Sequence, residues 1–385
     1  MFGVFHRRAM LCSNLNITIT ITRTPSFLQH FSSSKQHSFT TNYLINNLTF
    51  SPETASKLST RVRLKNSDQP NSVLALFRTH GFSNTQLSKI IQTFPKLLSF
   101  NPNKTVLPKF NFLLSKGAST SDLVQIVTKN PSVLKQGLAN TITPCYDFLK
   151  RFLVSDESTI YSIKYCPCLI YSKLPSINVQ LLLQNGVPES RIAFLLRSYF
   201  YSACKQPDVF KKVVEEVKGL GFNPKSTHFI VAVTTKLMGS SLWERKVDLY
   251  KKWGWSEEVI GSAFLRNPCC MWTSMDKIEA VMEFWVNGIG WDSLMLAKYP
   301  VLFTSSLEKK IIPRAFVLQF LQSRGLIKDV KSAPFKLTDD MFLQKFVNCF
   351  EEEASHLLKL YEEKMYQPRH ENASLSYFGF EDLNK

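Results

Sequence analysis

The chain contains 385 residues, of which 44% are hydrophobic, and it carries a formal net charge of +17. This apolar content is enough to bury a sizeable core, which excludes an intrinsically disordered protein. The positive excess indicates a polyanionic partner, because neutralising phosphates releases counterions and gives sequence-independent affinity. The same composition is also consistent with a basic soluble protein that has no such partner.

The N-terminal segment, residues 1–52, is acid-poor and rich in hydroxyl residues. It holds four Lys or Arg residues and fourteen Ser or Thr residues, and the first acid is Glu53. This composition predicts an organellar transit peptide that is cleaved before about residue 60, with a linker over 53–71. Polar residues interrupt the segment 11–21, which disfavours a secretory signal. We expect a mitochondrial location, with the chloroplast as the alternative.

A glycine recurs from residue 81 onward at a spacing close to 35 residues, with one copy missing near Leu153. The seven glycines are Gly81, Gly117, Gly186, Gly221, Gly254, Gly290 and Gly325. Two residues after each of the first six glycines, and at the matching place in the repeat that lacks a glycine, stand residues suited to begin a helix. These residues are Ser83, Ser119, Ser155, Pro188, Asn223, Ser256 and Asp292. Each glycine therefore predicts the end of one helix and the start of the next.

A second marker, a proline before an apolar pair, recurs with the same period. It occurs at Pro95, Pro131, Pro167, Pro268 and Pro300. Because the residue before proline disfavours helix, each proline predicts the turn between the two helices of one repeat. Phe200 and Thr235 stand where the pattern expects two further prolines, so these two repeats are degenerate.

One such repeat cannot bury its apolar face alone, whereas stacked copies can. We therefore predict an all-α, right-handed α-solenoid of about seven helix-turn-helix repeats over 72–330. A C-terminal capping helix is expected over 331–365 and a flexible tail over 366–385. The sequence has no run of eighteen apolar residues, so we expect no membrane insertion.

The repeat resembles that of the mitochondrial transcription termination factor (mTERF) family, particularly its plant organellar members. The match lies in an aliphatic or aromatic residue four positions before each proline, at Ile91, Val127, Ile163, Phe264 and Leu296. It also lies in the segments 72–83, 243–255 and 307–314, and it extends over about 42–365. The resemblance implies a curved superhelix whose basic groove binds nucleic acid in mitochondria or chloroplasts. The period alone would also suit tetratricopeptide or pentatricopeptide repeats.

Two sets of basic residues are candidates for phosphate contacts. The first set lies just before the proline or its substitute: Lys129, Lys164, Arg197, Arg266 and Lys298. The second set lies in or just before the second helices: Lys109, Arg245, Lys246, Lys309, Lys310 and Arg314. The first set would also complement helix dipoles, and the second would also suit solvated helix faces. Arg314 is the strongest single candidate, because it follows a fixed proline and arginine binds phosphate bidentately.

The sequence shows no catalytic, cofactor or metal motif. Its eight cysteines form no CxxC pair, and the close pairs Cys166/Cys168 and Cys269/Cys270 do not suit one tetrahedral zinc ion. Buried, reduced helix cysteines are the expected state. Phosphate-binding glycine motifs are also missing. We therefore predict that the protein is not an enzyme, with no catalytic residues, cofactor or metal.

Three functions fit these features. The leading hypothesis is binding of organellar double-stranded DNA in transcription termination or regulation. The second is binding of structured RNA to assist intron splicing, and the third is a protein–protein scaffold. We expect a monomer that works with transcription or splicing machinery. The sequence does not separate DNA from RNA, because phosphate contacts dominate binding to either.

Overall fold

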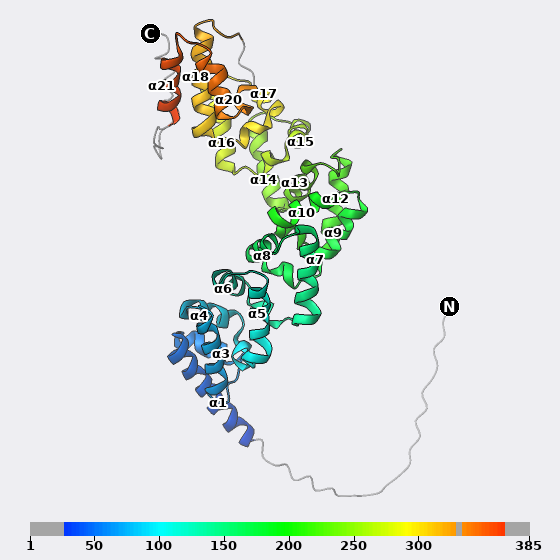
Figure 1. Cartoon of the computed structure of the whole chain (residues 1–385), viewed down its shortest axis with the longest axis vertical. Helices are drawn as coiled ribbons and strands as arrows, with labels where there is room; N and C mark the ends of the chain where they lie inside the picture. Colours follow the sequence, from blue (N-terminus) through cyan, green and yellow to red (C-terminus); the bar gives the residue numbers. More distant parts are fainter. Residues whose placement is uncertain (1–26, 329–332, 366–385) are drawn as a thin grey trace, which may run out of the picture. The chain divides into compact units, whose positions relative to one another are not determined.

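The computed structural model describes residues 27–328 and 333–365, and every regular element in these ranges is a helix (Figure 1). The chain divides into two compact units between Leu107 and Pro108. Among the described helices, none has both the length and the apolarity needed to cross a membrane. The predicted all-α repeat fold is confirmed.

The first unit begins earlier than the sequence predicts. Its helices are α1 (Phe27–Leu48), α2 (Pro52–Ser59), α3 (Asp68–Thr79), α4 (Asn84–Thr93), η1 (Pro95–Ser99) and η2 (Pro102–Val106). Helix α1 packs against α2, and Leu58, Val62 and Leu64 are buried. The amide of Leu64 donates to the hydroxyl of Thr40 at 3.0 Å. The linker prediction for 53–71 is therefore wrong, because these residues bury apolar side chains in the helical unit.

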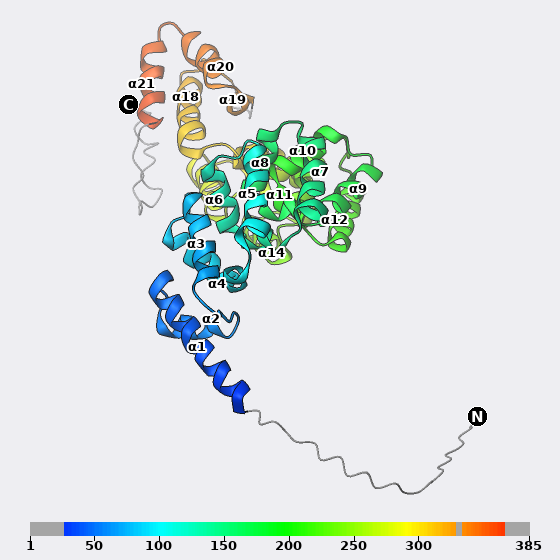
Figure 2. The ribbon, with the colours of Figure 1, turned by 60° about the horizontal axis from the view of Figure 1, so that its bottom comes forward.

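In the second unit, helix pairs follow one another along the chain. The first helices of successive repeats, beginning with the first unit, are α4, α6 (Thr120–Lys129), α8 (Asp156–Tyr165), α10 (Glu189–Ser198), α13 (Thr227–Lys236), α15 (Glu257–Arg266) and α17 (Ser293–Lys298). The second helices are α5 (Leu107–Ser115), α7 (Thr143–Leu153), α9 (Leu174–Gln184), α12 (Pro207–Gly219), α14 (Ser240–Lys252), α16 (Met275–Glu283) and α18 (Ile312–Ser323). Figures 1 and 2 show α7 beside α10 and α9 beside α12. Within the described part of the chain these pairs number seven, as predicted.

Short helical turns join the two helices of most repeats. All five marker prolines begin such turns: η1, η3 (Pro131–Lys135), η5 (Pro167–Ile170), η6 (Pro268–Met271) and η8 (Pro300–Phe303). Further wide turns lead into or extend second helices: η2, η4 (Leu138–Ile142), η7 (Phe284–Gly288) and η9 (Leu307–Ile311). In the fourth repeat, Phe200 begins the short helix α11 (Phe200–Ala203). Thr235 instead lies inside α13, which continues to Lys236, so the predicted turn at Thr235 is wrong.

The expected helix starts are confirmed with one exception. Ser83 and Ser119 each form a reciprocal capping box, with Gln86 and Asp122 respectively. Asn223 does not cap α13, because Ser226 accepts the hydrogen bond from the Phe229 amide instead. The seven marker glycines all have positive φ, between 70° and 90°. Side chains other than glycine rarely adopt this backbone conformation, which explains the marker.

Val154 takes the place of the missing glycine. Its φ is +68° and its ψ −45°, and the Ser155 amide donates to the Leu153 carbonyl at 2.8 Å, which closes a tight three-residue turn. Such a turn is strained for a β-branched residue. The Val154 side chain is 78% exposed, so removing it loses little packing.

We expect Val154→Gly to raise the free energy of unfolding by about 1 kcal/mol, because relief of strain outweighs the added freedom of the unfolded chain. Urea unfolding followed by circular dichroism would measure this change. The reciprocal variant Gly221→Ala, at a φ of +90°, should lower the same quantity by roughly 1–2 kcal/mol. A Val154→Gly protein no more stable than wild type would contradict the account of strain.

The C-terminal cap is more complex than one helix. It consists of α19 (Ala333–Lys336), α20 (Asp339–Leu343), η10 (Gln344–Asn348) and α21 (Ala354–Met365). Helix α21 packs against α18, as both views show (Figures 1 and 2). The prediction of a single capping helix is therefore wrong. The predicted tail, 366–385, and residues 1–26 of the predicted transit peptide lie outside the described residues.

Candidate nucleic-acid interface

Six successive first helices of the second unit carry a basic residue in their last turn. We call this set the basic row: Lys129, Lys164, Arg197, Lys236, Arg266 and Lys298. Helix α8 contacts both α6 and α10, α10 contacts α13, and α15 contacts α17, so these first helices lie side by side. The sequence predicted every member except Lys236. The predicted turn at Thr235 concealed that residue.

The cations of the basic row differ in their exposure and in their hydrogen-bond or ion-pair partners. Arg197 and Lys298 are exposed at the ends of α10 and α17. Lys129 is exposed and donates to the carbonyl of Tyr165, while the Arg266 guanidinium donates to the carbonyl of Ala297 at 3.4 Å. Both carbonyls belong to the next first helix along the chain. These four cations therefore remain at the surface.

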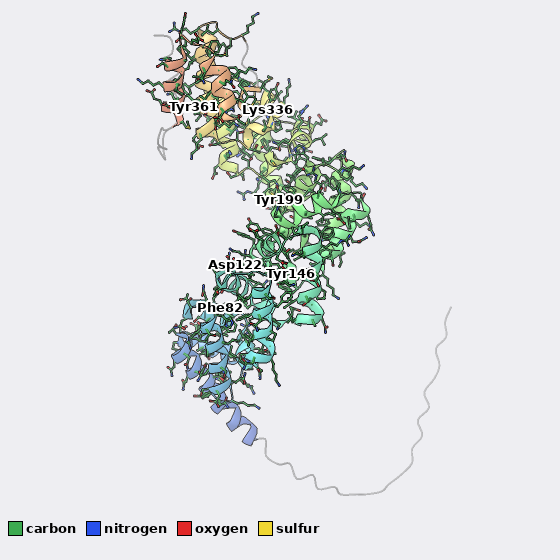
Figure 3. The ribbon with its side chains drawn as sticks, in the orientation of Figure 1. Phe82, Asp122, Tyr146, Tyr199, Lys336 and Tyr361 are labelled. Carbon is green, nitrogen blue, oxygen red and sulfur yellow. The ribbon has the colours of Figure 1, made fainter. Side chains whose placement is uncertain are left out.

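The other two members form ion pairs. Lys164 contacts Asp122 at 2.6 Å, and Lys236 contacts Glu216 at 2.7 Å. Hydrogen bonds from Lys164 and Ser119 lower the pKa of Asp122, which is labelled in Figure 3. A partner anion would have to compete with these carboxylates. Lys164 and Lys236 are thus weaker candidates for phosphate contacts than the four exposed cations.

An aromatic cluster adjoins the basic row. We call Tyr161, Tyr165, Phe200 and Tyr201 the tyrosine patch, and its tyrosines are 48%, 37% and 55% exposed in that order. The Tyr161 and Phe200 rings lie 4.7 and 6.0 Å from the Tyr165 ring, centroid to centroid. The Lys129 ammonium lies 5.8 and 5.7 Å from the ring centroids of Tyr165 and Tyr201. Exposed rings beside a cation suit base stacking. Sequence reasoning missed this cluster, because its rings come from α8 and α11, which belong to two different repeats.

Comparison with known proteins places the repeats in a family. The mTERF family model matches residues 74–241 and 237–352. The chain belongs to the mTERF family. It is 21% identical over 258 residues to "Transcription termination factor MTERF15, mitochondrial" of Arabidopsis thaliana. This match covers 67% of this chain and 50% of that protein. It is 23% identical over 295 residues to "Transcription termination factor MTERF8, chloroplastic" of the same plant, with coverage of 71% and 56%. The chain thus spans about half the length of the curated relatives it matches.

Three predicted phosphate contacts are instead buried between mTERF repeats. Lys109 is 8% exposed and donates to the Leu134 carbonyl at 2.6 Å, and Lys246 is 3% exposed and donates to the Met271 carbonyl at 2.5 Å. Burial lowers the pKa of both ammonium groups. Arg314 is fully buried. The prediction is wrong for these three residues, because each charged group already serves protein acceptors away from solvent.

These buried groups occupy one recurring structural position. Lys109, Asn178, Lys246 and Arg314 lie on α5, α9, α14 and α18, at intervals of 69, 68 and 68 residues. The Asn178 amide donates to the carbonyls of Ala203 and Lys205 at 2.9 and 2.8 Å. The Lys109, Asn178 and Lys246 side chains satisfy carbonyls in the segment that follows the next first helix, and Arg314 satisfies carbonyls in and just after α19. Buried carbonyls of this kind are costly to leave unpaired. Every second repeat thus uses a buried polar side chain to hold the segment that follows it.

The remaining members of the second predicted set stay predictions. Arg245 and Lys309 are exposed on α14 and η9. Lys310 is half-buried, and burial together with the nearby Arg314 charge lowers its pKa. None of the three belongs to the basic row. They are therefore weaker candidates than its exposed members.

Three of the cysteines converge. Cys166, Cys168 and Cys204 place their sulfur atoms within 4.8 Å of one another. The sequence argument considered only neighbours along the chain, so it missed Cys204, which comes from the next repeat. Cys270 is buried as expected, whereas Cys349 is exposed. Cys12 lies outside the described residues.

Proposed function

We propose that the protein binds organellar double-stranded DNA through the exposed cations of the basic row and regulates transcription, including its termination. The observation that carries the proposal is the recurrence of a cation at the end of six successive first helices. Duplex DNA offers a regular series of phosphates, and cations on a repeating scaffold match such a series. Backbone contacts of this kind position a protein on DNA without reading its sequence.

The relatives' names and the N-terminal composition support an organellar location. One relative is named as mitochondrial and the other as chloroplastic, and residues 1–52 contain no acid. We propose the mitochondrion, with the chloroplast as the alternative, and a monomer that works with the transcription machinery.

A reporter fused to residues 1–60 tests the location directly. We expect it to enter mitochondria, because basic, hydroxyl-rich and acid-free segments are typical of import signals. Fluorescence microscopy with mitochondrial and chloroplast markers would measure the outcome. A reporter that stayed in the cytosol would exclude this segment as an import signal.

The tyrosine patch favours a second candidate function, binding of structured RNA in support of splicing. Sequence-specific RNA recognition uses unpaired bases that stack on aromatic rings, and Tyr161, Tyr165 and Tyr201 are exposed. Base stacking on an aromatic residue contributes about 1–3 kcal/mol by alanine substitution. Tyr201→Leu should therefore weaken RNA binding about fivefold or more while leaving duplex DNA binding unchanged.

One experiment separates these functions. Cross-linking the protein to nucleic acid in intact organelles, followed by sequencing, identifies the bound class. Binding of the purified protein to duplex DNA and to structured RNA, with Tyr201→Leu and the ring-preserving Tyr201→Phe, checks the assignment. Recovery of DNA with no effect of Tyr201→Leu supports the leading proposal. Specific enrichment of neither nucleic acid would favour the protein scaffold.

A further inference from the structure

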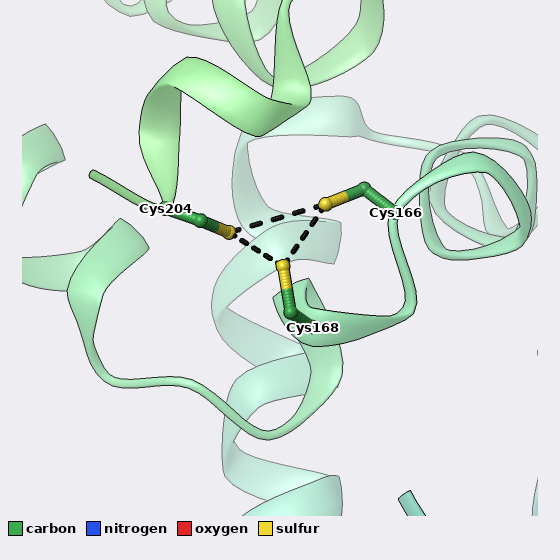
Figure 4. A group of neighbouring side chains, drawn as sticks. All are labelled: Cys166, Cys168 and Cys204. Atoms are coloured by element: carbon green, nitrogen blue, oxygen red, sulfur yellow. Dashed lines mark hydrogen bonds between the residues drawn. The ribbon is translucent and has the colours of Figure 1, made fainter. Parts of the chain in front are cut away.

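The cysteine cluster joins the turns of two successive repeats. Cys166 directly follows α8 and Cys168 lies in the η5 turn, whereas Cys204 directly follows α11 in the next repeat (Figure 4). The sulfur atoms are 3.0 Å apart for Cys166 and Cys168, 2.9 Å for Cys168 and Cys204, and 4.0 Å for Cys166 and Cys204. These separations exceed the S–S bond of about 2.05 Å, so all three are free thiols.

The surrounding structure fixes the positions of these sulfur atoms. Pro167 separates Cys166 from Cys168 and fixes the backbone between them. On the other side, the buried Asn178 amide donates to the carbonyls of Ala203 and Lys205, which flank Cys204. Cys166 is buried, while Cys168 and Cys204 are half-buried. The cluster is thus held firmly but is reachable from solvent.

We propose that Cys166, Cys168 and Cys204 bind one thiophilic metal ion, Zn²⁺ or Cu⁺, through their three thiolates. Both ions prefer sulfur ligands. Bonds of about 2.3 Å from zinc to sulfur place tetrahedral ligands about 3.8 Å apart. The Cys166–Cys168 and Cys168–Cys204 sulfur separations would have to increase by about 1 Å to reach this value. Cu⁺ would use the three sulfurs alone, whereas Zn²⁺ would add a solvent molecule as its fourth ligand.

A metal ion binds cysteine in the thiolate form. The three thiols would therefore release their protons to solvent as the ion binds.

The metal ion would stabilise a turn that lacks the usual proline. Five repeats begin the turn after the first helix with proline, but the fourth has Phe200 there. A metal ion bound to Cys204 would fix this proline-free turn against the proline turn of the third repeat. Tyr165 precedes Cys166 directly, and Tyr201 donates to the Tyr165 carbonyl at 2.7 Å. Metal binding would therefore also fix the two turns that carry the tyrosine patch.

Metal titration of the full chain tests the proposal. Protein purified in reductant and stripped with a chelator is titrated with Zn²⁺, with Cu⁺ and with Co²⁺, whose thiolate charge-transfer and d–d absorption report sulfur ligands and tetrahedral geometry. We expect one ion per chain. Cys204→Ser should weaken binding by more than about a hundredfold, because a direct ligand matters at least as much as the groups that orient ligands. The matched control Cys269→Ser, on the η6 turn, should bind as wild type does.

A second measurement does not depend on how well the variants fold. Alkylation of wild-type protein, followed by mass spectrometry, should show that bound metal protects Cys166, Cys168 and Cys204 but not the exposed Cys349. Preference for Zn²⁺ or Cu⁺ in competition identifies the ion. The proposal is overturned if no ion binds above the level of the Cys204→Ser protein. It is also overturned if Cys168 and Cys204 form a disulfide under mild oxidation equally fast with and without metal.

Discussion

Replacing Arg314 by methionine is expected to lower the free energy of unfolding by about 3 kcal/mol, because the variant leaves buried carbonyls without a donor. The guanidinium is fully buried and donates to the carbonyls of Pro334 and Leu337 at 2.8 and 2.9 Å. It also contacts Asp339 and lies 4.7 Å from the centre of the Phe342 ring. One side chain on α18 thus holds the segment from α19 to α20.

Two controls separate this role from a surface charge. Lys309→Ala removes an exposed cation from the same repeat and should change stability by less than about 0.5 kcal/mol. Asp339→Asn removes only the ion pair, and its effect should be small because the Asp339 side chain is 67% exposed. Urea unfolding measures stability, and limited proteolysis should cut Arg314→Met faster after residue 332. An Arg314→Met protein as stable as Lys309→Ala would contradict the assigned role.

The sequence predicted the repeat accurately wherever a marker has one local cause. Pro95 and Pro268 end helices because proline removes a donor and restricts the residue before it, so their turns were predictable without knowledge of packing. Positive φ explains the glycines equally well. Where the proline marker is missing, as at Thr235, the predicted turn was also wrong. Local stereochemistry therefore determined most of what could be predicted about the fold.

The fate of each cation was harder to predict, because it depends on what the next repeat presents. Lys109 lies in the first turn of α5 and Lys129 at the end of α6. Only Lys109 is buried, and it donates to the Leu134 carbonyl of the neighbouring turn. A proline before Arg314 suggested a rigid phosphate contact, but the same rigidity directs the guanidinium into the C-terminal cap. Cys204 illustrates the same limit, because its partners lie 36 and 38 residues earlier. These contacts form between repeats, where local sequence patterns give little information.

The basic row leads to the second large expected effect, on the salt dependence of DNA binding. Log affinity for duplex DNA falls with log salt at a slope of about −0.9 for each phosphate neutralised. Replacing Arg197, Arg266 and Lys298 by alanine together should reduce the magnitude of that slope by roughly 2.7 and weaken binding to all duplex sequences alike. These residues are exposed at helix ends, so the folded structure should be retained.

A matched triple variant removes the same charge from outside the row. Lys211, Lys212 and Lys225 are also exposed, and their replacement by alanine lowers the net charge equally. We expect that protein to keep nearly the full slope, because counterion release follows direct phosphate contacts rather than total charge. Binding isotherms of both proteins on duplex DNA between 50 and 200 mM salt measure the slope. Over this range, six to ten phosphate contacts lose about 10³–10⁵ in affinity. Equal loss of slope in the two triple variants would assign binding to diffuse charge instead of the basic row. A flat salt dependence of the wild type would argue against nucleic acid as the partner.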